Sequence, residues 1–188
     1  MDHYVDLTIR PDPEFPAHQL MSALYAKLHR ALVNLRADGI GVSFPGFNAK
    51  PASIGTRLRL HGSPSSLQTL METDWLLGMR DHTHVTGIQP IPEGAAHRHV
   101  FRVQAKSSPE RLRRRAMRRH GLSEDDARTR IPEAAGKTLA LPFVQLSSRS
   151  TGQLSFPLFI EHGPIEQHAV PGRFNSYGLS REATVPWF

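Results

Sequence analysis

The chain has 188 residues, 39% of them hydrophobic and 21% charged, which is enough for one or two compact domains with a buried core. It has no cysteine, so disulfides and thiolate chemistry are excluded, and no apolar run approaches the roughly 18 residues that a membrane span needs. A net charge of +6 favours an anionic partner, and we expect a cytoplasmic protein.

The first half of the chain predicts alternating strands and helices. Val5, Leu7 and Ile9 alternate with polar residues, which is the period of a half-buried strand. From Ala17 to about Ala37, apolar residues recur at spacings of three and four, which predicts a long amphipathic helix that closes near Gly39. Further along we expect strands at 40–44, 56–60 and 82–88, an irregular loop at 47–53, and a short helix that begins at Ser63-Pro64.

This order, strand-helix-strand-strand-helix-strand, is typical of a ferredoxin-like fold, in which helices cover one face of an antiparallel sheet. The segment 89–95 is rich in Pro and Gly and marks a boundary. We therefore predict an α+β protein. Its ferredoxin-like domain spans 1–94, and a C-terminal α/β domain spans 95–188 and carries an arginine-rich helix at 109–120.

The positive charge is concentrated between Arg102 and His120. This stretch holds eight basic residues against the single acid Glu110, a balance of +7, so the remaining residues together carry −1. Ser108 suits an N-cap, Pro109 suits the first helical turn, and Gly121 suits a left-handed stop. At 100° per residue, one face of this helix collects five arginines, namely Arg111, Arg114, Arg115, Arg118 and Arg119.

Such a one-sided arginine face indicates a polyanion, and we favour nucleic acid. The alternative is a solvated basic helix that pairs with scattered acids. Membrane-surface binding fits less well, because Arg113 and His120 occupy the side where apolar bulk would be needed. After this helix we expect a short one capped by Ser123 that stops before Pro132, and then strands at 141–146, 158–162 and within 177–188.

RNA can be cut without a metal when its own 2′-hydroxyl attacks the neighbouring phosphorus, provided that a base takes the proton. Histidine suits this role, because its ordinary pKa of about 6.5 leaves it largely neutral at pH 7. The chain has eleven histidines. His29 lies one position off the apolar stripe of the long helix, and on pattern alone it is more typical of a surface histidine.

Two other patterns are weaker. The pairs His82/His84 and His97/His99 would each share a strand face, but they lack the further ligands that a metal site usually shows. The run from Ser147 to Gln153 offers hydroxyls, including Ser150 and Thr151, that suit a phosphate or ribose, although such runs are most often plain loops. We therefore expect no metal and no cofactor.

Over its whole length the chain resembles the type I-F CRISPR repeat endoribonuclease family, which processes precursor CRISPR RNA. The motifs that carry the resemblance are MDHY, RPDPEFP, QLMS, KLH, IGVSFP, RVQAK, PERLRRR, MRRH, RIP, LPFV, STGQ, HGP, YGLS and VPWF, in this order. The resemblance implies that the arginine helix enters the major groove of a short RNA hairpin stem. It also implies a role as a subunit of an RNA-guided surveillance complex, with no membrane partner.

The same resemblance implies roles for individual residues. Arg102 and Gln104 would read base edges, because arginine pairs with guanine and glutamine with adenine. His29 would be the general base, Ser148 would position the ribose, and Tyr177 would orient the histidine. The helix arginines with His120 would hold the phosphate backbone.

A phenylalanine stacks on the base pair next to the cut in this family. The chain has one extra residue in this region, which makes Phe156 the candidate and Leu154 and Ser155 its rivals. The expected activity is metal-independent cleavage of the repeat hairpin, with a 2′,3′-cyclic phosphate and a 5′-hydroxyl as ends and with the product kept bound. The alternative is an RNA hairpin-binding protein that does not cut.

Overall fold

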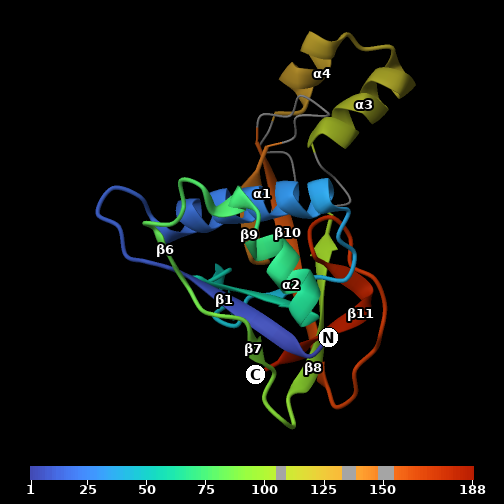
Figure 1. The fold of residues 1–188 in the computed structure, drawn as a ribbon. Helices are drawn as coiled ribbons and strands as arrows, with labels where there is room; N and C mark the ends of the chain where they lie inside the picture. Colours follow the sequence, from blue (N-terminus) through green and yellow to red (C-terminus); the bar gives the residue numbers. More distant parts are fainter. Residues whose placement is uncertain (105–108, 133–138, 148–154) are drawn as a thin grey trace. The chain divides into compact units, whose positions relative to one another are not determined.

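A computed structural model describes residues 1–104, 109–132, 139–147 and 155–188 (Figure 1). Contacts divide the chain into two compact units, one formed by 1–102 with 141–188 and one formed by 103–140. The protein is α+β, with antiparallel strand pairing in its sheets, as the sequence predicts. No helix within the described ranges is long and apolar enough to cross a membrane.

The first sheet lies in the N-terminal half. Its strand order is β2-β5-β1-β6, and β7 also pairs with β1. Each of the predicted strands is present, although the bounds shift by a few residues. The strands are β1 (His3–Ile9), β2 (Gly41–Ser43), β5 (Arg57–Gly62) and β6 (Thr83–Val85), together with β7 (Gln89–Pro90), which was not predicted. Leu7 of β1 faces Leu58 of β5 in the antiparallel register, so apolar side chains meet on the covered face.

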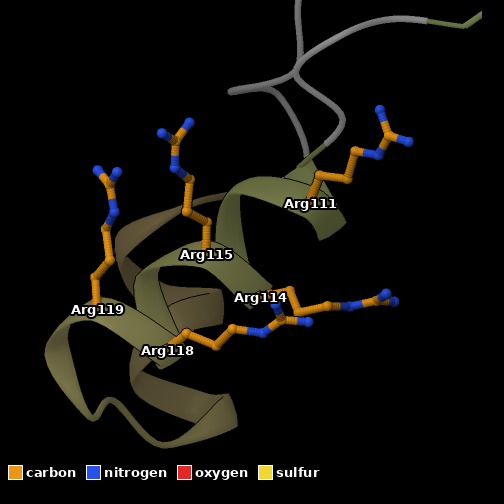
Figure 2. A pocket seen from close by; sticks show the side chains of 5 residues that line it. All are labelled: Arg111, Arg114, Arg115, Arg118 and Arg119. Carbon is orange, nitrogen blue, oxygen red and sulfur yellow. The ribbon is translucent and has the colours of Figure 1, made fainter.

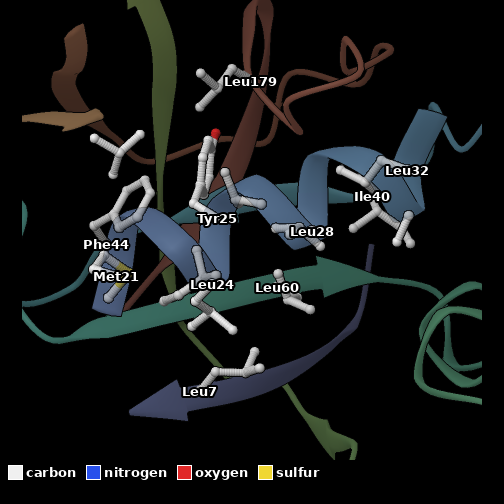
Figure 3. Close-up of a cluster of buried hydrophobic side chains, with 14 of the residues drawn as sticks. Leu7, Met21, Leu24, Tyr25, Leu28, Leu32, Ile40, Phe44, Leu60 and Leu179 are labelled. Atoms are coloured by element: carbon white, nitrogen blue, oxygen red, sulfur yellow. The ribbon is translucent and has the colours of Figure 1, made fainter. Parts of the chain in front are cut away.

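Helix α1 (Ala17–Leu35) supplies much of the core (Figure 3). Leu24 and Leu28 are fully buried, and Figure 3 shows them beside the strands that carry Leu7 and Leu60. The predicted end near Gly39 is wrong by a few residues. The helix ends at Leu35, because Arg36 adopts a left-handed conformation with φ 51° and its N–H bonds back to the last turn.

Helix α2 (Pro64–Met71) begins as predicted, since the Ser63 hydroxyl accepts the N–H of Ser66 at 3.1 Å. Both α1 and α2 contact β1, and they contact each other, so they cover the same face of the sheet. The short 3-10 helix η1 (Asp74–Leu76) was not predicted from the sequence. The predicted irregular loop at 47–53 is also a partial error, because it contains a small hairpin of β3 (Asn48–Ala49) and β4 (Ala52–Ser53).

The second sheet has the order β11-β8-β10-β9. Its strands are β8 (Ala96–Val103), β9 (Phe143–Leu146), β10 (Phe156–Glu166) and β11 (Ser180–Trp187). The sequence interpretation missed β8, in which only Val100 is buried and basic residues and histidines alternate with no clear apolar face. Arg102, the predicted base-reading residue, lies near the C-terminal end of this strand.

The predicted boundary between 94 and 95 falls between the two sheets, but both sheets belong to one compact unit. Strand β11 contacts β2, and the apolar core continues from Leu7 through Val42 to Val185. The division into domains at 1–94 and 95–188 therefore stays a prediction.

The unit 103–140 contains α3 (Pro109–His120) and α4 (Glu124–Arg130), which pack together. The predicted stop of α3 is confirmed, because Gly121 has φ 61° and its N–H donates to the Met117 carbonyl. Ser123 caps α4 as predicted, with its hydroxyl accepting the N–H of Asp126 at 3.1 Å. The predicted cap Ser108 lies outside the described residues.

Candidate nucleic-acid interface and cleavage site

The basic face of α3 is built as the helical spacing predicts. Two rows of arginine side chains leave the helix and line an open groove of about 360 Å³ (Figure 2). These residues are Arg111, Arg114, Arg115, Arg118 and Arg119. All five are exposed, whereas Leu112, Ala116 and Met117 are half-buried on the other side. The helix therefore presents two rows of guanidinium groups to solvent.

Among the described residues of this unit, one acid on α3 pairs with an arginine of that face. Arg114 forms an ion pair with Glu110 at 3.7 Å, in which both side chains remain about two-thirds exposed. Within α3, whose residues are all described, no side chain is buried. Arg113 has a different task, because its Nε donates to the Ile131 carbonyl at 2.8 Å and thereby joins α3 to the end of α4. Like charges this close repel, so an anionic ligand would stabilise the helix.

His29 is held by a backbone carbonyl. It lies on α1, and its Nδ1 is 2.7 Å from the carbonyl oxygen of Ser176. A carbonyl oxygen only accepts hydrogen bonds, so Nδ1 must carry the proton. The neutral imidazole then has its lone pair on Nε2, which makes Nε2 the atom that can accept a proton from another group.

Tyr177 lies directly against this imidazole. The two rings are stacked, with 4.1 Å between their centroids and 10° between their planes. The backbone carbonyl of Tyr177 accepts the hydroxyl hydrogen bond of Tyr25 at 2.7 Å. The structure thus brings together two of the three residues that the sequence predicts for catalysis.

Arg102 lies near the rings of both Tyr177 and Phe156. The Arg102 guanidinium carbon is 5.7 Å from the centre of the Tyr177 ring and 5.9 Å from the centre of the Phe156 ring. Its Nε is buried and has no hydrogen-bond partner among the described residues. A cation within about 6 Å of an aromatic ring centre is attracted to the ring, and a base could compete for either ring.

Other predicted residues are placed elsewhere or lie outside the described ranges. Ser148, Ser150, Thr151 and Leu154 are in the segment that is not described. Gln104 and His120 are exposed in the unit 103–140. Ser155, a rival of Phe156, is engaged by the side chain of Gln145. The predicted roles of all these residues stay predictions.

One histidine of each pair has an ordinary partner, whereas the Nδ1 atom of His97 is buried without a hydrogen-bond partner among the described residues. His82 bonds Asp12 at 2.8 Å, and His99 lies 3.3 Å from Glu166 and 3.0 Å from the Ala183 carbonyl. Across the described part of the chain, no group of three or more His, Cys, Asp or Glu residues could hold a metal.

The sequence interpretation missed Tyr25 and the carbonyl of Ser176. Tyr25 precedes His29 by four residues, so the helical period already places both on one side of α1. A carbonyl has no signal in the sequence, because every residue carries one. Only the fold shows that the chain before Tyr177 passes His29.

The chain matches the family model described as CRISPR-associated protein (Cas_Csy4) over residues 4–188. Two relatives, both named CRISPR-associated endonuclease Cas6/Csy4, align with all 188 residues and over their own full length. The protein of Pseudomonas aeruginosa (strain UCBPP-PA14) is 54% identical, and that of Escherichia coli (strain UTI89 / UPEC) is 46% identical. The chain therefore belongs to the Cas_Csy4 family of CRISPR-associated endonucleases.

Proposed function

We propose that this endonuclease cleaves the repeat hairpins of precursor CRISPR RNA and does so without a metal. The observation that carries the proposal is the hydrogen bond between His29 Nδ1 and the Ser176 carbonyl, which leaves Nε2 as a base. The arginine face of α3 supplies the affinity for RNA, because its guanidinium groups match phosphate oxygens.

In the proposed reaction, His29 Nε2 takes the proton of a ribose 2′-hydroxyl. The 2′-oxygen forms a bond to the adjacent phosphorus as the bond from phosphorus to the 5′-oxygen breaks. The leaving 5′-oxygen takes up a proton, so the products end in a 2′,3′-cyclic phosphate and a 5′-hydroxyl. Because the nucleophile is already part of the substrate, the protein has only to align it and move the proton.

Tyr177 restricts the imidazole by stacking on it, and Ser148 would fix the ribose. Arg102 and Gln104 would read base edges of the stem. The helix arginines, with His120, would hold the backbone in the major groove, and Ser150 and Thr151 would add contacts near the cut. Phe156 would stack on the closing base pair.

The remaining expectations are part of the same proposal. The order β2-β5-β1-β6 supports a ferredoxin-like N-terminal domain. The enzyme would stay on its product in the cytoplasm and act as a subunit of a type I-F surveillance complex.

Repeat RNA incubated with the protein in EDTA tests this function. We expect one cut per hairpin, a cyclic phosphate end, and no cut when the single 2′-hydroxyl at that position is replaced by hydrogen. Binding of the deoxy-substituted hairpin should be unchanged, since the phosphates remain. A 3′-hydroxyl end or a need for added Mg²⁺ would show that another mechanism operates, and binding without a cut would favour the non-catalytic alternative.

A further inference from the structure

Two side chains of α1 hold two consecutive carbonyls of one turn. We call residues 175–179 the carbonyl turn. The Tyr25 hydroxyl donates to the carbonyl of Tyr177, and His29 Nδ1–H donates to the carbonyl of Ser176, each at 2.7 Å. Residues four apart project from the same side of a helix, so α1 grips the turn at two neighbouring points.

Tyr25 is a firm anchor for this grip. It is fully buried, and its ring packs against Phe44 with 5.6 Å between centroids. Figure 3 shows its hydroxyl oxygen pointing toward Leu179. Burial, followed by the proximity of Tyr177, holds the pKa of the Tyr25 hydroxyl well above its usual value, so the hydroxyl stays a donor. Loss of this donor would leave the Tyr177 carbonyl without the bond.

Asn175 fixes the turn from within. Its side-chain oxygen accepts the N–H groups of Tyr177 at 2.9 Å and Leu179 at 3.3 Å, and its carbonyl accepts that of Gly178 at 2.8 Å. Gly178 has φ 69°, and a Cβ there would lie 2.7 Å from the side chain of Val42. The turn therefore has little freedom to move away from β2.

We propose that Tyr25 and Asn175 are positioning residues for cleavage at His29, an inference that rests on the proposed function. Together they fix the carbonyl turn in the orientation in which the Ser176 oxygen selects the imidazole tautomer. The same orientation keeps the Tyr177 ring on the imidazole. Both residues act through the turn. They therefore keep His29 Nε2 unprotonated and correctly oriented, and they do not contribute to RNA affinity.

The test is the double variant Tyr25→Phe/Asn175→Ala, which removes three hydrogen bonds to the turn and keeps the aromatic core residue. We expect single-turnover cleavage at saturating protein to become about tenfold slower, with hairpin affinity within about twofold of wild type. Nitrogen-15 NMR of the His29 ring should show a fall in the fraction that carries its proton on Nδ1. The single variant Asn175→Asp, in which Tyr25 is unchanged, retains the acceptor oxygen. It should show the wild-type cleavage rate and the wild-type fraction of His29 with its proton on Nδ1.

Tyr4→Phe is the matched control for Tyr25→Phe. It also removes a tyrosine hydroxyl that donates a hydrogen bond of 2.7 Å, in this case to the side chain of Gln89. It should cleave like wild type. Asn175 is exposed, so Asn175→Ala alone tests the inference if the double variant fails to fold, with a rate about threefold lower. If the double variant and Asn175→Ala both show the wild-type cleavage rate and the wild-type His29 tautomer, the inference is overturned, provided that His29→Ala is inactive. An active His29→Ala variant instead overturns the proposed function.

Discussion

The imidazole of His29 lies flat against the phenol ring of Tyr177, with centroids 4.1 Å apart. The contact joins a helix of the first half of the chain to the last turn before β11. A stacked ring blocks one face of the imidazole and limits its rotation, so Nε2 keeps one direction. This relationship leads to the first prediction.

Tyr177→Phe should retain most of the cleavage activity, because the ring and the carbonyl that Tyr25 holds are both kept. Tyr177→Leu should cut about three- to tenfold more slowly, since an aromatic pair contributes about 0.5–1.5 kcal/mol. Single-turnover rates with repeat RNA measure both. Equal losses in the two variants would show that the hydroxyl, rather than the ring, carries the effect.

Arg102→Ala should weaken discrimination at one base pair of the stem by about 1–3 kcal/mol, because a guanidinium pairs bidentately with guanine. The affinities of the native hairpin and of hairpins with single base-pair changes give the answer. If Arg102→Ala weakens all hairpins equally, the residue is a backbone contact.

Arg118→Ala should lower affinity for all hairpins alike and reduce the slope of log affinity against log salt by about 1, because one phosphate contact is lost. Arg113→Ala is the matched control on the same helix. Its guanidinium bonds the Ile131 carbonyl, so this change should lower the stability of the α3–α4 pair and leave the salt slope nearly unchanged. Equal changes of slope in both variants would contradict this division.

Stability should fall below pH 6.5. Burial, with Arg59 nearby, lowers the pKa of His61 to about 3, and burial, with Arg98 nearby, does the same for His162. Between pH 6.5 and 3 the unfolded chain binds protons at these positions and the folded chain does not. The stability is therefore complete above pH 6.5 and is lost as the pH falls toward 3, by roughly 1–2 kcal/mol per histidine at pH 5.

His162→Phe should make denaturant unfolding less dependent on pH, because the new ring can stack on Phe47 and has no proton to bind. His168→Phe, at an exposed position, serves as control and should keep the wild-type dependence. A wild-type slope in His162→Phe would mean that this histidine is not held neutral.

Many of the helices and strands could be predicted from the sequence, because hydrophobic periodicity and helix capping depend on residues that are close together in the chain. The arginine face of α3 and the Ser63 and Ser123 caps follow from spacing alone. Strand β8 was missed, since its partners β10 and β11 lie far along the chain and its own side chains show no apolar face. The role predicted for His29 came from the family resemblance, whereas its partner, the Ser176 carbonyl, comes from the fold.

The most direct test of the account is single-turnover cleavage of the repeat hairpin by His29→Ala, with His18→Ala as an exposed control on the same helix. Loss of the general base should slow cleavage by about 10²–10⁴-fold. Hairpin affinity should stay close to wild type, because the arginines of α3 are unchanged. Cleavage by His29→Ala at the wild-type rate would contradict the account.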